Sequence, residues 1–179
     1  TSFHVRSDSS TFLIDCGVTT LIGMNRLGLA TSDIDMVCVS HLHGDHSGGL
    51  AWLLIDAQYV SKRTRPLIVT GPRGIEERFV RAAEAHYPDI TKCQRCFPFD
   101  FIEYEEQVPL TLNGISIMPY EVKHPSGAPP YALRFGIDGK VLSFTGDSGW
   151  TENLCPAAQG ADLLISECFQ YDVTLPIHL

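Results

Sequence analysis

Short apolar runs, separated by polar and glycine-rich turns, make up most of the first half of the chain. Three of these runs are rich in β-branched residues and predict strands, at residues 11–16, 34–40 and 66–70. Three longer stretches space their apolar residues as helices do, at residues 19–27, 51–60 and 75–86. Gly28 follows the first of these stretches and is expected to end that helix. Residues 91–100 show neither period and are expected to be irregular.

In the second half, two glycine-containing pairs separate runs of alternating character. Asn113-Gly114 and Asp138-Gly139 are typical of two-residue hairpin turns. The flanking runs predict paired strands, at residues 108–112 with 115–124 and at residues 131–137 with 140–147. A short helix at residues 153–158 and a strand at residues 162–168 follow. Interleaved strands and helices predict an α/β protein whose sheets are covered by helices. We expect residues 1–179 to form a single domain that is incomplete at both ends.

Composition and charge disfavour two classes of binding partner, long nucleic acids and membranes. Apolar residues make up 44% of the chain and charged residues 19%, as in ordinary globular proteins. The formal net charge is -8, so the chain lacks the broad basic surface with which proteins bind long nucleic acids. No apolar run approaches the roughly 20 residues that a membrane-spanning helix needs. We therefore expect no extended nucleic acid and no membrane as partners, and the oligomeric state stays open, a homodimer included.

The cysteines are scattered along the chain, at Cys16, Cys38, Cys93, Cys96, Cys155 and Cys168. Their spacing is not that of a disulfide framework, and it favours a cytoplasmic protein with free thiols. Cys38 and Cys168 fall within strand-like runs, where we expect buried thiols. Cys93 and Cys96 form a single CxxC pair, which is either a plain loop or half of a structural zinc site with two further ligands.

Three cations, Lys62, Arg63 and Arg65, follow the helix predicted at residues 51–60. Cations at this position complement the partial negative charge of a helix C-terminus. The alternative is a phosphate-binding patch beside the functional site.

Histidine and aspartate crowd together directly after the strand predicted at residues 34–40. His41, His43, Asp45 and His46 fall within six residues, and Gly44 gives the backbone between them freedom to turn tightly. Neutral imidazole and carboxylate are ligands for zinc, and for iron or manganese nearly as well. A histidine-rich surface loop is the alternative, but only a position after a buried strand gives such a motif its meaning.

This HxHxDH motif resembles that of the metallo-β-lactamase fold superfamily, and the resemblance covers essentially the whole chain. In that family the later ligands are a His at a strand end, an Asp after a strand and a last His. His124 in EVKH, Asp147 in SFTGDS and His178 in PIHL match these positions. The resemblance implies a four-layer αβ/βα sandwich of two mixed β-sheets flanked by helices.

The resemblance also implies how two divalent metal ions are held, most simply Zn²⁺, with Mn²⁺ or Fe²⁺ as alternatives. The first ion would be held by His41, His43 and His124. The second would be held by Asp45, His46 and His178, with Asp147 bridging both. A water shared by two cations loses a proton near neutral pH and acts as a nucleophile. Asp45 and Asp147 are the expected catalytic residues, with Asp45 orienting the nucleophile or protonating the leaving group. Such a cationic pocket suits a small, anionic substrate.

Glu167, in ISEC, is a further carboxylate near the predicted site. It either orients a ligand histidine from behind or is an ordinary carboxylate at the end of a strand.

Several residues of this sequence differ from those of known branches of the superfamily, and these differences disfavour some of the possible reactions. The β-lactamases generally have a Cys at the position of Asp147, and the flavin-coupled diiron reductases have a Glu at that of His43, so both activities are disfavoured. The 23-residue interval from His124 to Asp147 and the TGDS turn resemble the phosphodiesterase branch. Against tRNA maturation, Ser166 stands where that family usually has a His, and no long basic, glycine-rich arm is present. We expect a hydrolase for a small or cyclic phosphodiester. A thioester or lactone hydrolase of the glyoxalase II or lactonase type and an inactive metal-binding sensor are the alternatives.

Overall fold

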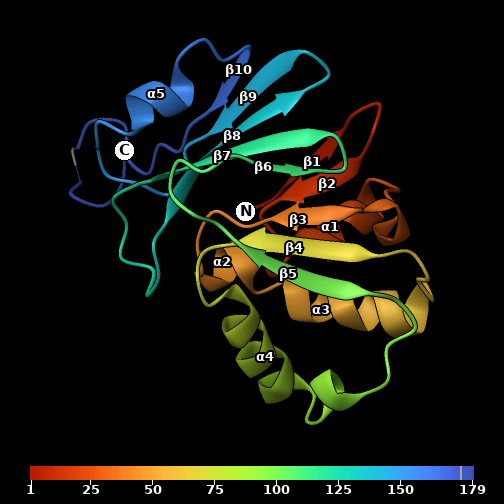
Figure 1. Cartoon of the computed structure of the whole chain (residues 1–179). Helices are drawn as coiled ribbons and strands as arrows, with labels where there is room; N and C mark the ends of the chain where they lie inside the picture. The colour runs from red at the N-terminus through yellow and green to blue at the C-terminus, as the bar shows by residue number, and fades with distance from the viewer. Residues whose placement is uncertain (174) are drawn as a thin grey trace. The chain divides into compact units, whose positions relative to one another are not determined.

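The computed structural model describes residues 1–173 and 175–179 (Figure 1). Its residues divide into two compact units. The first unit contains Thr1–Arg6 and Thr11–Glu103, and the second contains Ser7–Ser10 and Tyr104–Leu179. Whether the two units form the predicted single domain stays a prediction.

The first unit is built on a five-stranded mixed sheet. Its strands are adjacent in chain order: β1 (Phe3–Arg6), β2 (Thr11–Ile14), β3 (Met36–Cys38), β4 (Leu67–Gly71) and β5 (Phe99–Glu103). β1 pairs antiparallel with β2, and every later pair is parallel. Parallel neighbours need a crossover connection, and helices supply it here.

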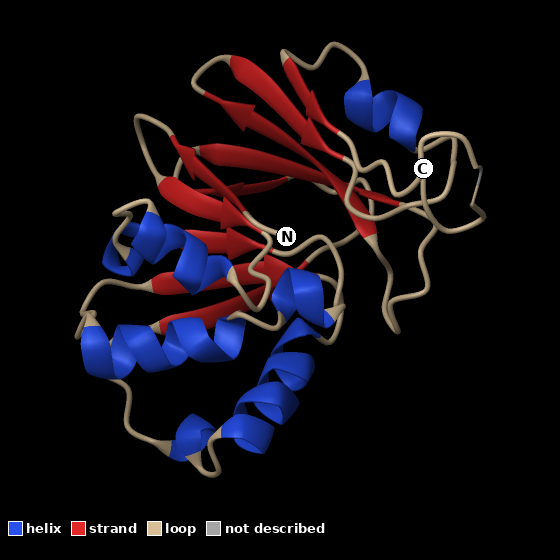
Figure 2. Ribbon diagram, turned by 180° about the vertical axis from the view of Figure 1, so that it is seen from behind, coloured by secondary structure: helices blue, strands red, loops and turns tan. Residues whose placement is uncertain are grey.

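The helices of the first unit lie beside this sheet (Figure 2). They are α1 (Thr20–Arg26), α2 (Gly44–Ser47), α3 (Leu50–Ile55) and α4 (Ile75–His86), with short 3₁₀ turns at Thr31–Asp33 and Ile90–Lys92. A π-helical turn, Asp56–Val60, extends α3. The bounds of α4 are those predicted from its apolar spacing, and Gly28, with φ +67°, follows α1 as expected. The sequence did not predict β1 or β5, and the first two residues of β5, Phe99 and Asp100, fall in the stretch that was expected to be irregular.

Apolar side chains that the strands and helices share form the core of this unit. Phe12, Leu13 and Ile14 of β2 are fully buried, so β2 is covered on both faces, as strands inside parallel sheets are. Phe79 of α4 packs its ring 5.2 Å from that of Phe99 in β5. Fully burying one such side chain stabilises the fold by roughly 1.5–3 kcal/mol.

Arg63 contradicts the idea of a phosphate-binding patch after α3. Its side chain is 4% exposed, and its guanidinium donates to the backbone carbonyls of Arg65 at 2.8 Å, Ser32 at 3.0 Å and Pro66 at 2.6 Å. Arg65 itself pairs with Asp35. Arg63 therefore ties the segment after the π-helical turn to its neighbours and is not available to a ligand.

Arg63→Ala is expected to lower the free energy of unfolding by about 3 kcal/mol, because it leaves three carbonyls without their charged donor. Urea denaturation followed by circular dichroism measures the change. Arg73→Ala, at an exposed arginine of the same unit, should shift stability by less than about 0.5 kcal/mol. Equal effects of the two variants would show that the Arg63 hydrogen bonds contribute little.

The second unit contains another five-stranded mixed sheet. In the order of the sheet, its strands are β10 (Leu163–Ile165), β9 (Lys140–Phe144), β8 (Tyr131–Ile137), β7 (Ile115–Glu121) and β6 (Leu110–Leu112). β10 runs parallel to β9, and the other pairs are antiparallel. Both predicted hairpins are present. Their turn residues have positive φ angles, 49° and 80° at Asn113 and Gly114 and 48° and 75° at Asp138 and Gly139, which two-residue turns of this kind require.

The helix α5 (Leu154–Ala158) packs on this second sheet. Leu154 and Ala157 are buried against Val122 and Ala132. The predicted α/β class, with two mixed sheets flanked by helices, is confirmed.

None of the described helices is both long enough and apolar enough to cross a membrane. The six cysteines are free thiols. Cys16 and Cys38 are buried, and burial raises the pKa of the Cys16 thiol to about 12. The prediction of a buried Cys168 is wrong, because β10 ends at Ile165 and Cys168 is exposed in the loop beyond it.

Candidate metal centre

The predicted metal ligands of the first unit lie in residues 41–49, which we call the metal loop. Close backbone packing against the turn after β2 fixes this loop: the Cys16 amide donates to the His46 carbonyl at 2.6 Å, and the Gly49 amide donates to the Cys16 carbonyl at 2.8 Å. A Cβ atom on Gly17 would lie 2.1 Å from the Asp45 carbonyl oxygen, and one on Gly49 would lie 2.3 Å from that of Gly17. Glycine at both positions therefore lets the loop approach β2.

Two of the loop histidines are deeply buried. His41 is 0% exposed and His46 is 1% exposed. The His46 ring lies 4.0 Å from that of His41, and the ring of the half-buried His43 lies 4.9 Å from it. The rings of His43 and His46 therefore both lie close to the ring of His41.

Asp15 follows β2 and is hydrogen-bonded to His46 directly and to His41 through the Ser40 hydroxyl. Its carboxylate is 0% exposed and lies 2.7 Å from Nδ1 of His46. It also accepts hydrogen bonds from the Ser40 amide at 2.7 Å and the Ser40 hydroxyl at 3.0 Å. Burial raises the pKa of the Asp15 carboxyl, and the hydrogen bonds from His46 and Ser40 oppose that rise.

These contacts determine which ring nitrogen of each histidine faces outward. An ionised carboxylate only accepts hydrogen bonds, so His46 donates from Nδ1 to Asp15, and Nε2 is its candidate ligand atom. The Ser40 hydroxyl gives its one proton to Asp15, so its oxygen accepts from Nδ1 of His41, 3.1 Å away. In His41, too, Nε2 is therefore the candidate ligand atom. Histidines that bind metals are commonly oriented in this way.

Asp45 lies next to the other ring nitrogen of His46, Nε2. Its side chain is 66% exposed, and its Oδ2 atom lies 3.2 Å from Nε2 of His46. A lone pair and a carboxylate oxygen repel at this separation unless a proton or a cation lies between them. Either a proton on Nε2 of His46 or a cation held by both groups accounts for this contact.

The predicted ligands of the second unit also lie together. His124 follows β7, Asp147 follows β9, and His178 lies near the end of the chain. Their potential ligand atoms all lie within 4.8 Å of one another. The His124 and His178 rings meet edge to face at 4.9 Å. Metal–ligand distances are about 2.0–2.2 Å, so these three side chains are close enough to belong to one metal centre.

Hydrogen bonds also set the tautomers in this unit. Nδ1 of His124 donates to the Ile177 carbonyl at 3.0 Å. Nδ1 of His178 donates to the Glu167 carboxylate, with the nearer oxygen at 2.8 Å. In both rings Nε2 is therefore the candidate ligand atom. Glu167 therefore contacts a predicted ligand histidine, as the first of its two interpretations expects, and it accepts a hydrogen bond from the Ser148 amide.

Asp15 and Ser40 were not predicted from the sequence. Asp15 closes the apolar run FLID, and a carboxylate at the end of a buried strand was the signal available. His41 and Asp147 also follow predicted strands, but each of them belongs to a motif of the family. Asp15 belongs to no such motif.

The fold and these donors define the chain as a metallo-β-lactamase fold protein with a candidate metal centre. A family model described as "Anti-Pycsar protein Apyc1" matches residues 1–178, and the chain belongs to this family.

Curated relatives are ribonucleases by name. Ribonuclease Z from Agathobacter rectalis is 35% identical over 141 residues, which are 78% of this chain and 44% of the relative. Ribonuclease Z from Lachnoclostridium phytofermentans is 35% identical over 143 residues, 79% of this chain and 45% of the relative. The chain thus spans less than half the length of these two relatives.

Solved structures share the fold. The metallo-β-lactamase fold protein YhfI from Bacillus subtilis has a TM-score of 0.75 and 25% identity, covering 100% of this chain and 68% of that one. Human tRNase Z, short form, has a TM-score of 0.74 and 23% identity, with 96% and 72% coverage. A diphosphatase from the PhnP family has a TM-score of 0.72 and 20% identity, with 99% and 63% coverage.

Proposed function

We propose that this protein is a dinuclear metal-dependent hydrolase whose preferred substrate is a small or cyclic phosphodiester. One observation carries the proposal: His41, His46, His124 and His178 each place Nδ1 within 3.1 Å of a hydrogen-bonding oxygen, an arrangement that favours the same tautomer in all four and makes Nε2 the candidate ligand atom. Surface histidines have no reason to share one tautomer, whereas metal-binding histidines do.

The ligand assignment in this proposal is the one that the resemblance to the superfamily implies. His41, His43 and His124 would hold one ion, and Asp45, His46 and His178 would hold the other, with Asp147 bridging. The donor set of imidazoles and carboxylates suits Zn²⁺ first and Mn²⁺ or Fe²⁺ as alternatives. When bound, such ions activate water and polarise a phosphoryl oxygen.

The side chains of the protein have distinct roles in this proposal. Asp15 and Glu167 fix the imidazoles of His46 and His178, so the ligands are oriented before any ion binds. The exposed Asp45 carboxylate is able to exchange protons with solvent and with a leaving group.

The substrate class rests on charge and on the relatives. The names ribonuclease Z and diphosphatase support chemistry at phosphorus. The net charge of -8 opposes binding of a long polyanion, so we place a small phosphodiester ahead of RNA. RNA cleavage is the second candidate, because the ribonuclease Z relatives are 35% identical. Thioesters or lactones and an inactive sensor remain as outcomes of the tests below.

Metal content tests the dinuclear centre. Protein purified without chelator is expected to contain about two metal ions per chain by elemental analysis. Less than one equivalent, even after reconstitution with zinc, manganese or iron, would contradict the dinuclear proposal.

A substrate panel tests the reaction. The metal-loaded protein is expected to hydrolyse bis-p-nitrophenyl phosphate and a cyclic nucleotide, and to leave β-lactams nearly untouched. Cleavage of a thioester or a lactone about a hundredfold faster than any phosphodiester would assign the protein to the acyl-transfer branch. Faster cleavage of a structured RNA than of both small phosphodiesters would favour the second candidate, and no turnover on any substrate would favour the sensor.

A further inference from the structure

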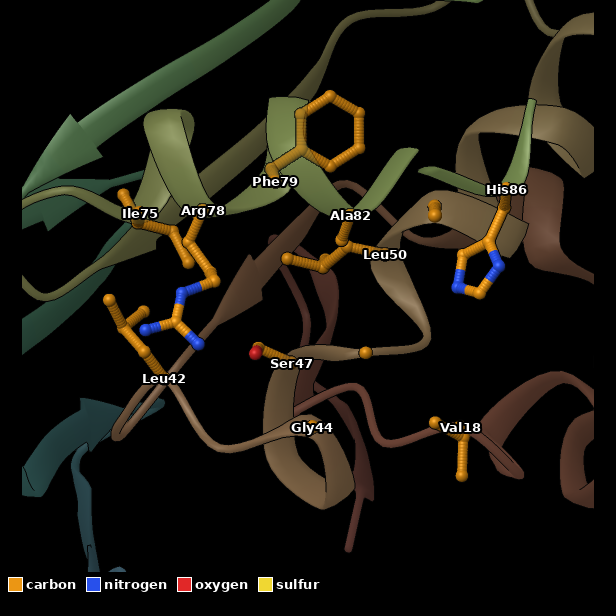
Figure 3. Close-up of a pocket in the computed structure, with 12 residues that line it drawn as sticks. Val18, Leu42, Gly44, Ser47, Leu50, Ile75, Arg78, Phe79, Ala82 and His86 are labelled. Carbon is orange, nitrogen blue, oxygen red and sulfur yellow. The ribbon is translucent and has the colours of Figure 1, made fainter. Parts of the chain in front are cut away.

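A pocket of about 260 Å³ lies within the first unit, between α4 and the segment that leads from the metal loop into α3 (Figure 3). The side chains of Leu42, Leu50, Ile75 and Phe79 give it apolar walls. None of the seven predicted metal ligands is among its lining residues. The pocket is therefore a separate feature of the unit that the proposed reaction does not use.

Arg78 places a positive charge in these apolar walls. Its guanidinium points from α4 toward Leu42 and Ser47 (Figure 3). Within residues 1–173 and 175–179, no carboxylate or carbonyl accepts a hydrogen bond from this guanidinium. Arg81, one turn further along α4, instead pairs with Glu77. In a chain of net charge -8, the guanidinium of Arg78 thus keeps its N–H donors available for a ligand, as far as the described residues show.

Further polar and aromatic groups complete the pocket. The Ser47 hydroxyl donates its proton to the His43 carbonyl at 3.0 Å, so its oxygen is left to accept from a ligand. His86 lines the opposite end of the pocket from Leu42, and its ring lies 5.5 Å from that of Trp52 at an angle of 33°. One end is therefore cationic and the other aromatic.

We propose that this pocket binds a small aromatic anion, with its ring system against Leu50 and Phe79 and its anionic group on Arg78. The volume is just below the range of pockets for drug-sized ligands, which matches one or two fused rings. A guanidinium forms paired hydrogen bonds with planar or tetrahedral oxyanions, so a carboxylate, a phosphate or a sulfonate would suit it.

An anion bound in this pocket would contact residues of the metal loop. Gly44 and Ser47 line the pocket, and they belong to the same short helix α2 as Asp45 and His46. A ligand there would contact the pocket side of α2 without touching the predicted ligands.

Calorimetric titration of the full chain with naphthalene-2-sulfonate tests the charge at Arg78, with neutral naphthalene-2-methanol as the matched probe. We expect the sulfonate to bind more tightly than the alcohol. Arg78→Gln should weaken sulfonate binding about tenfold and leave alcohol binding unchanged. Arg81→Gln, three residues away on α4, removes the same charge outside the pocket and should change neither. Equal effects of the two variants on the sulfonate would overturn the proposal.

Two further measurements locate the probe. Ala82→Phe places a ring in the pocket and should abolish binding of both probes. In a Trp150→Phe background Trp52 is the one remaining tryptophan, and the sulfonate should change its fluorescence. Sulfonate binding should also persist, within about tenfold, after the metal is removed with chelator. An unchanged Trp52 signal, or complete loss of binding with the metal, would place the probe elsewhere and refute the proposed site.

Discussion

Replacing Asp147 by alanine is expected to lower the hydrolysis of bis-p-nitrophenyl phosphate by about two to three orders of magnitude while the fold persists. Asp147 follows β9, with a side chain 21% exposed and one oxygen 4.0 Å from Nε2 of His124. A carboxylate that bridges two cations holds both, so its loss removes more than a single contact to one ion. Initial rates with saturating zinc or manganese, together with the metal content of the variant, measure the effect.

A control of the same charge is available in the second unit. Glu152→Ala removes one negative charge at an exposed position and should keep nearly wild-type turnover. Wild-type turnover in Asp147→Ala at full metal content would show that this carboxylate is not a ligand. Loss of turnover in both variants would instead point to the charge of the whole unit.

The elements that the sequence predicted are those with a strong local signal. The hairpin at Asn113-Gly114 depends on two adjacent residues that tolerate positive φ, and α4 depends on one unbroken apolar period. Each of these signals lies within the element itself.

The elements that were missed depend on partners far away in the sequence. β5, Phe99–Glu103, directly follows Pro98 and an irregular CxxC stretch, and its pairing with Leu67–Gly71 defines it as a strand. β1 precedes the first strong apolar run, and antiparallel pairing with Thr11–Ile14 defines it. Local periodicity carries no information on such pairing.

The candidate site divides in the same way. The loop histidines and Asp147 were predicted because a family motif spaces them. Asp15 was missed because its role arises from tertiary contact, across 31 residues, with His46. The candidate metal ligands could therefore be predicted from the sequence better than the groups that hold these side chains in place.

Asp15→Asn is expected to weaken metal binding about 10- to 100-fold while leaving the fold intact. Asp15 has φ 60°, a conformation that asparagine adopts readily and most other residues do not, so asparagine is the matched replacement. The amide oxygen of asparagine still accepts the Ser40 amide hydrogen bond, but its NH₂ group then faces Nδ1 of His46. His46 must accept at Nδ1 and carry its proton on Nε2, and the lone pair that would bind the ion is lost.

Competition with a chromophoric chelator measures the metal affinity, and urea denaturation of the metal-free protein measures the fold. We expect Asp15→Asn to cost about 1–3 kcal/mol of unfolding free energy. Ser40→Ala is the matched comparison, since it keeps the Ser40 amide hydrogen bond and removes only the hydroxyl between Asp15 and His41. It should weaken metal binding less than Asp15→Asn does, because His46 keeps its carboxylate partner. Unchanged metal affinity in Asp15→Asn would mean that the buried carboxylate stabilises the fold without orienting a ligand.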